Sequence, residues 1–185
     1  MKKFLSSQLG QGLLEMVFAI GILLIVVAAI LALTTSNIVG QKESEFQIVA
    51  NNLAREGIEV VRNIRDSNWL SGQPWDQGLV GNAAIAEFNP ANDSWQLDFD
   101  YSPGDELLYF SANNVFSHTV SGQQTIYERE LNLDNICLAA GQENIRPTCQ
   151  SGEQKIGLKI TSVVKWIERG RNRKVTLEDL LYEWK

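Results

Sequence analysis

The most prominent pattern in the chain is an unbroken apolar run near its N-terminus. The 18 residues from Met16 to Leu33 include no charged or strongly polar side chain. A helix of this length rises about 27 Å, close to the ~30 Å hydrocarbon core of a bilayer. Lys2 and Lys3 precede the run and the rest of the chain is acidic, so the positive-inside rule places the N-terminus in the cytoplasm. The pattern predicts a single-pass protein of the cytoplasmic membrane, with residues 36–185 in an extracytoplasmic location.

The helical periodicity continues beyond the apolar run, but on one side only. No proline interrupts the chain from Met1 to Gln73, and we predict one continuous helix from about Gly12 to about Arg65. Its first half, residues 11–35, is apolar all round and needs lipid or other helices around it. Its second half, residues 36–68, is amphipathic and needs a domain to lie against. The apolar side chains of the second half recur at helical spacing, and they are Phe46, Val49, Leu53, Val60 and Ile64.

Alternation of apolar and polar residues predicts an antiparallel sheet in residues 69–185. A stretch rich in Trp, Gly and Pro, residues 67–82, predicts the loop that leaves the helix. The clearest alternation places one face of a strand at Ile156, Leu158, Ile160, Val164 and Trp166. Other segments with strand character are 94–102, 106–112, 114–122 and 125–137, with a turn at 168–174 and a last strand or short amphipathic element at 175–184. The fold class is therefore α+β, a long N-terminal helix packed on a C-terminal antiparallel sheet domain.

The order of segments differs from that of an ordinary secretory signal peptide. Such a signal has an apolar region of about 7–15 residues, followed by a small-residue cleavage site. Here the apolar run is longer, and the small-residue candidate, Gly10, comes before it. A simple signal peptide and a plain uncleaved anchor remain as alternatives.

Composition and charge narrow the functional classes. Apolar residues make up 44% of the chain and charged residues 21%, an ordinary globular balance. The formal net charge is −6, and removal of the first ten residues, with Lys2 and Lys3, would change it to −8. We expect no nucleic-acid partner, because a duplex binder needs cations to replace counterions.

The stretch LGQGLLEMVFAIGILL, residues 9–24, resembles the N-terminus of type IV pilins and of the pseudopilins of type II secretion. Four features coincide: a short basic leader, Gly10 at its end, Glu15 five places further on, and an unbroken apolar run. Gln11 stands where many members carry Phe or Met. The stretch ANNLAREGIEVVRNIRDSNW also resembles the helix end of minor pilin-like proteins. The resemblance covers residues 1–68 and becomes loose beyond them.

The resemblance implies a maturation step and an assembly step. Residues 1–10 would be a prepilin leader, removed by a prepilin peptidase that cuts between Gly10 and Gln11 and N-methylates Gln11. In pilin-like filaments the fifth-position carboxylate, here Glu15, meets the N-terminal amine of a neighbouring subunit, which offsets its desolvation and sets the register. A Glu15 side chain that extends to the lipid headgroups is the alternative. The implied partners are the peptidase, other pilin or pseudopilin subunits, the cytoplasmic membrane, and the assembly platform of a pilus or secretion machine.

Cys137 and Cys149 are the two cysteines of the chain, and eleven polar, turn-like residues lie between them. In an extracytoplasmic domain such a pair is a candidate disulfide. The family often carries a cysteine-bounded loop near its C-terminus, which supports this pairing, and two unpaired buried thiols are the alternative. We expect no metal centre, because the chain has one His and zinc usually takes four ligands.

The sequence contains no motif for catalysis, and we expect neither enzymatic activity nor a cofactor. His118 would need an adjacent nucleophile such as Ser117 or Ser121, and no nucleophile motif surrounds it. The acidic stretch 92–106 offers oxygen ligands for calcium but lacks EF-hand spacing. Arg169, Arg171, Arg173 and Lys174 predict a basic turn, which is either solvated or able to touch DNA or the acidic face of a neighbouring subunit.

These observations favour a structural subunit, a minor pilin or minor pseudopilin that polymerises through its N-terminal helix after leader cleavage. Assembly would place it in a cell-surface or periplasm-spanning filament of a type IV pilus or a type II secretion-like machine. A membrane-anchored extracytoplasmic binding module that never polymerises is the alternative, and it gives Glu15 no task. A tethered hydrolase is a third hypothesis, and it would need a cleft with perturbed titratable groups.

Overall fold

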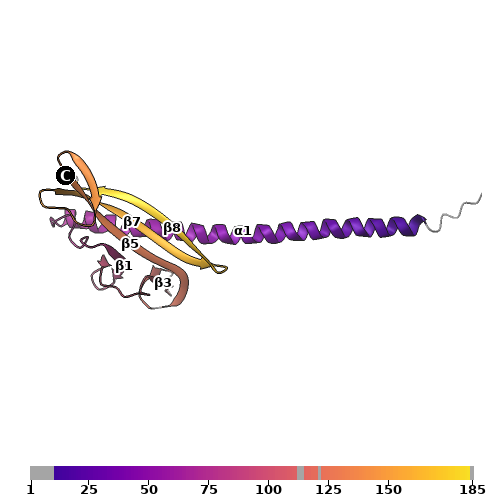
Figure 1. Ribbon diagram of the computed structural model, residues 1–185. Helices are drawn as coiled ribbons and strands as arrows, with labels where there is room; N and C mark the ends of the chain where they lie inside the picture. Colours follow the sequence, from indigo (N-terminus) through magenta and orange to yellow (C-terminus); the bar gives the residue numbers. More distant parts are fainter. Residues whose placement is uncertain (1–10, 112–114, 121, 184–185) are drawn as a thin grey trace, which may run out of the picture. The chain divides into compact units, whose positions relative to one another are not determined.

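A computed structural model describes residues 11–111, 115–120 and 122–183 of the chain (Figure 1). The chain divides into two compact units, the first ending at Glu45 and the second spanning Phe46–Lys185. The helix α1 (Gln11–Leu70) contributes to both units. The strands that follow it are β1 (Ala83–Asn89), β2 (Ser94–Asp98), β3 (Leu107–Phe110), β4 (Phe116–Ser117), β5 (Gln123–Ala139), β6 (Gln142–Arg146), β7 (Gln154–Glu168) and β8 (Arg171–Tyr182).

The prediction of one continuous helix is confirmed, but α1 ends at Leu70, five residues later than expected. The loop that follows the helix stabilises this extra turn, because the Asn68 side chain donates hydrogen bonds to the carbonyls of Trp75 and Gln77, at 3.1 and 2.8 Å. The chain then leaves the helix through Gly72, whose φ is 69°. The Gln73 amide donates to the Asn68 carbonyl at 2.9 Å, which is the closing bond of a Schellman motif.

The strands of the second unit form an antiparallel sheet with the order β2-β1-β5-β3-β4, and β5 also pairs with β6 and β7. The strand β7 pairs in turn with β8, and the long strands β5, β7 and β8 lie side by side (Figure 1). The predicted alternation in β7 is confirmed from Leu158 onwards, since Leu158, Ile160, Val164 and Trp166 are all buried, whereas Ile156 is only half-buried. The antiparallel sheet and the α+β class are therefore as expected.

Two groups of side chains join the second half of α1 to the sheet. Towards the C-terminal end of the helix, Ile58, Val61 and Ile64 pack with Leu158 and Leu181 of β7 and β8. Nearer Phe46, the side chains of Ala50 and Leu53 pack with a second group, which consists of Leu108, Tyr127, Val164 and Trp166. The strand β7 and the helix therefore run in opposite directions, and the β7–β8 turn lies at the Phe46 end of the domain.

Two strands were not predicted, β1 and β6. The residues of β1 do not alternate, because Ala84, Ile85 and Ala86 are all buried. The strand β6 lies inside the polar cysteine loop, where the sequence predicted a turn. It forms because Ala140 and Gly141, with φ values of 49° and 80°, make a two-residue hairpin turn that pairs polar residues with β5.

The strand boundaries correct three further predictions. The strands β2 and β4 are shorter than the segments 94–102 and 114–122 that were expected to form them. The turn expected at 168–174 is only two residues long, Arg169 and Gly170, with φ values of 50° and 73°. The basic residues Arg171–Lys174 belong to β8 and not to a turn.

The structure joins Cys137 and Cys149 in a disulfide with a Cα–Cα distance of 5.6 Å. Cys137 lies in β5, and its side chain is buried. The bond ties the segment that follows β6 back to β5. It therefore closes the loop that contains the unexpected hairpin.

Candidate functional site

The first candidate site is the exposed apolar surface of α1. By length and composition this part of the helix can span a membrane, and none of its most apolar 18-residue window is buried in the protein. Its large apolar side chains are between 43% and 72% exposed. Soluble monomers rarely expose apolar patches beyond a few hundred Å². Contact with lipid or with the helices of other molecules would remove this surface from water.

Glu15 lies on α1 just before the apolar run, and its side chain is exposed. Among the described residues it has no ion-pair partner. Gln11 is the first residue of α1, and residues four apart lie on the same face of a helix. Positions 11 and 15 therefore lie on the same face of the helix. Gly10, the predicted cleavage residue, lies outside the described residues.

A buried polar cluster lies between α1 and the sheet, and the sequence analysis did not identify it. Its centre is Arg129 of β5, which is fully buried. The Arg129 Nη1 atom lies 3.5 Å from Glu56 Oε1 and donates to the Leu53 carbonyl at 3.4 Å. Burial lowers the pKa of Arg129, and Glu56 opposes this shift. Arg129 lies two residues from the apolar Tyr127 and Leu131, and alternate residues of a strand share a face. This spacing was the one signal in the sequence that Arg129 faces inward.

The approach of α1 to this cluster depends on Gly57. A Cβ atom at this position would lie 2.7 Å from Leu131 Cδ2 and 2.9 Å from the hydroxyl of Ser162. Both distances are shorter than van der Waals contact, so a larger residue would push the helix away from the sheet. Ser162 is itself fully buried, on the inward face of β7.

His118 is buried beside this cluster. Its Nδ1 atom donates to the Asp105 carbonyl at 2.9 Å, since a carbonyl oxygen can only accept. Desolvation by burial, together with the positive charge of Arg129, lowers the pKa of His118 from 6.5 to about 4. The imidazole is therefore neutral in the folded protein at physiological pH, and its hydrogen bond is to backbone and not to a Ser hydroxyl.

The lowered pKa of His118 predicts a loss of stability in mild acid. Between pH 6.5 and about 4 the unfolded chain binds a proton that the folded chain does not, so the free energy of unfolding falls as the pH falls. The contribution lost is at most about 3 kcal/mol. Urea unfolding of the full chain in detergent, followed by Trp fluorescence at pH 7 and pH 4.5, measures it.

The variant His118→Gln is the control for this effect. Glutamine does not titrate, so the variant should lose clearly less stability than the wild type over the same interval. Carboxylates titrate equally in both proteins and cancel in the comparison. Equal losses in the two proteins would contradict the assignment.

The oxygen ligands that the acidic stretch 92–106 offers make hydrogen bonds within their own loop. In the acidic stretch, Asp98, Asp105 and Glu106 each accept a hydrogen bond from a backbone amide of their own loop, at 2.9, 2.9 and 2.7 Å. Within the described ranges, potential ligand atoms gather within 4.8 Å of one another at Cys137, Cys149 and Glu153. The two sulfur atoms are bonded to each other, so Glu153 alone remains to coordinate an ion.

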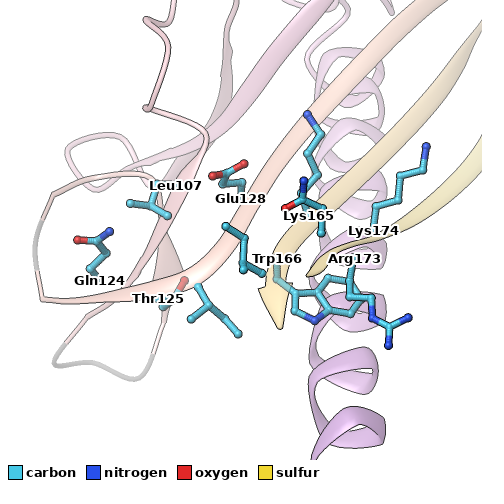
Figure 2. Close-up of a pocket in the computed structure, with 11 residues that line it drawn as sticks. Leu107, Gln124, Thr125, Glu128, Lys165, Trp166, Arg173 and Lys174 are labelled. Atoms are coloured by element: carbon cyan, nitrogen blue, oxygen red, sulfur yellow. The ribbon is translucent and has the colours of Figure 1, made fainter. Parts of the chain in front are cut away.

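A groove of about 710 Å³ lies where β5 meets the β7–β8 hairpin (Figure 2). Lys165 pairs with Lys174 and Trp166 with Arg173 across the two strands, and Figure 2 shows the two ammonium groups directed the same way. The residues that line the groove combine apolar side chains with three cations and one carboxylate. They are Leu107, Gln124, Thr125, Ile126, Glu128, Lys165, Trp166, Ile167, Asn172, Arg173 and Lys174.

The chain was compared with models of protein families, with curated proteins and with solved structures, and none of the three comparisons found a match.

Proposed function

We propose that this chain is a minor pilin or minor pseudopilin, a structural subunit of a type IV pilus or a type II secretion-like filament. The observation that carries the proposal is the first part of α1, an all-round apolar surface that leads without a break into the helix of the folded sheet domain. Membrane lipid covers this surface before assembly, and the helices of neighbouring subunits cover it afterwards.

Glu15 supports the filament over a simple anchor. A carboxylate among apolar side chains is costly unless it is paired. Cleavage after Gly10 would create a cationic amine at Gln11, on the same helical face as Glu15. In the proposed filament the subunits are staggered, so the amine of one subunit meets Glu15 of the next and the pair acts between subunits.

The alternative is a membrane-anchored binding module that never polymerises. The groove beside the β7–β8 hairpin favours it, because a mixed apolar and cationic groove is a plausible ligand site. This alternative needs neither cleavage at Gly10 nor a partner for Glu15. The two proposals therefore differ in how the N-terminus is processed.

Processing of the N-terminus tests the proposal directly. The membrane-bound protein is purified with and without a co-expressed prepilin peptidase, and its intact mass and N-terminal sequence are determined. We expect Gln11 at the N-terminus, methylated, only when the peptidase is present. A side chain at the scissile position blocks the peptidase, so Gly10→Val should remain uncleaved.

The matched control is Gly12→Ala, since a Cβ atom at Gly12 has open space around it and alanine favours the helix. This variant should be cleaved like the wild type. A chain that keeps Met1, or that is cut after residue 33, would contradict the proposal and favour an ordinary anchor or signal.

A further inference from the structure

We propose that the β7–β8 hairpin tip, residues 165–174, together with the groove beside it, binds the anionic phospholipid headgroups of the membrane that holds α1. The hairpin tip would thereby hold the extracytoplasmic domain against the membrane until the subunit is incorporated. This inference rests on the membrane insertion in the proposed function, and it adds a lipid partner and a second contact with the bilayer.

The hairpin tip concentrates positive charge on an acidic protein. Residues 165–174 contain five Lys and Arg residues and one Glu, a net charge of +4, in a chain whose net charge is −6. The rest of the chain therefore carries −10. Arg169, Arg171 and Lys174 are exposed and have no ion-pair partner among the described residues. Lys165 is 51% exposed, and its Nζ atom lies 3.5 Å from Glu130 Oε2.

Exposed apolar side chains alternate with these cations. Ile167 is 65% exposed and lies between Lys165 and Arg169 on the outward parity of β7, while Ile126 on β5 is 45% exposed. Both isoleucines line the groove, as does Trp166. Cations interleaved with exposed apolar side chains suit the bilayer interface, where phosphates lie next to acyl chains. Glu128 is the carboxylate of the lining, so the four charged side chains there sum to +2.

The hairpin tip lies at the Phe46 end of the domain, which is where the chain enters the domain from the apolar run. Trp166 packs in the group that includes Phe46 and Ala50, and the Tyr127 hydroxyl donates to the Phe46 carbonyl at 3.3 Å. Phe46 is the first residue of the second unit, and twelve residues separate it from Leu33 at the end of the apolar run. As a helix these residues span only about 20 Å. The connection between the run and the domain is therefore short enough for the tip to contact the headgroups that flank the run.

Charge complementarity favours a lipid surface over a second copy of this chain. The most clustered carboxylates of the domain, in residues 98–106, already accept hydrogen bonds from their own loop amides. Contact with a solvated acidic face would also leave Ile167 exposed to water. At a membrane interface the cations can contact phosphates while the isoleucines contact acyl chains. Near an anionic membrane each cation strengthens binding about fivefold.

Fluorescence quenching by a lipid that carries the quencher on its headgroup tests the inference on the full chain. The variant Ile167→Cys is labelled with a fluorophore, since the two native cysteines are bonded to each other and do not react. The protein is reconstituted in vesicles of phosphatidylcholine alone or of phosphatidylcholine mixed with phosphatidylglycerol, each containing a headgroup-labelled quencher lipid. We expect quenching at least several-fold stronger in the anionic vesicles. A label at Leu70→Cys, at the far end of α1 in the same domain, should not respond.

Charge reversal supplies the matched comparison. The double variant Arg171→Glu and Lys174→Glu should abolish the difference between the two vesicle types, whereas Arg55→Glu, an exposed cation of α1 outside the tip, should preserve it. Equal quenching in both lipids would overturn the inference. Quenching that depends on the density of protein in the vesicle, and not on anionic lipid, would also overturn it and would indicate contact with a second copy of the chain. A chain that does not float with vesicles of either composition would overturn the membrane insertion of the proposed function itself.

Discussion

Replacing Glu56 by glutamine should lower the free energy of unfolding of the Phe46–Lys185 unit by roughly 1–3 kcal/mol, because it leaves a buried cation without its counter-ion. The value lies below that of a fully buried pair because the Glu56 side chain is 36% exposed. Arg129 is fully buried, and Glu56 is the carboxylate that opposes the lowering of its pKa. Neutral His118 offers no compensating charge. Urea unfolding of the full chain in detergent, monitored by Trp fluorescence, measures the loss.

The matched control for this prediction is Glu59→Gln, one turn further along α1. Glu59 pairs with Arg62 at the surface, with more than half of its side chain exposed, and such pairs contribute about 0–1 kcal/mol. A double variant, Glu56→Gln with Arg129→Met, separates the charge effect from lost packing. It should be more stable than Glu56→Gln alone, because the buried charge is gone. Equal effects of Glu56→Gln and Glu59→Gln would contradict the role given to Arg129.

Replacing Glu15 by leucine should reduce incorporation into filaments about 30-fold or more, while membrane insertion is retained. Removing one partner of a buried charge pair costs about 2–5 kcal/mol, most of it from the charge left unpaired. In the proposed filament that charge is the N-terminal amine of the neighbouring subunit, and leucine itself only increases the apolar character of the helix. Sheared filament and membrane fractions, compared by immunoblotting in the host with its assembly machinery, give both quantities.

The matched control is Glu45→Gln, an exposed carboxylate in the amphipathic half of the same helix. It should leave incorporation within about twofold of the wild type, as expected for an exposed charge. Loss of membrane insertion in Glu15→Leu would make the variant uninformative about assembly, so Glu15→Gln is tested beside it. Normal incorporation of both Glu15 variants would contradict the filament proposal and favour the anchored binding module.

The elements that local pattern determines were predictable from the sequence. The apolar run from Met16 to Leu33 and the proline-free continuation were enough for α1, since helix periodicity and span length are local properties. The alternation in β7 identified both its strand character and its buried face. The residues of β1 and β6 escaped prediction for the same reason, because neither segment alternates in the way that a half-buried strand does.

The polar cluster shows what local pattern cannot decide. Parity along β5 places Arg129 inward, but only the register of β5 under α1 places its guanidinium against Glu56 and the Leu53 carbonyl. Gly57 permits that approach, and a glycine within a helical pattern has no local signature of the contact it allows. The pairing of a buried charge depends on residues far apart in the chain.

By itself, then, the sequence determined a membrane-length helix and the α+β class, because helical and strand periodicity depend on neighbouring residues. The tertiary structure decided which cation is buried, and that the β7–β8 turn lies at the Phe46 end of the domain. The physical reason is that strand register and helix docking are set by the packing of the whole core, and they bring together side chains that no local spacing relates.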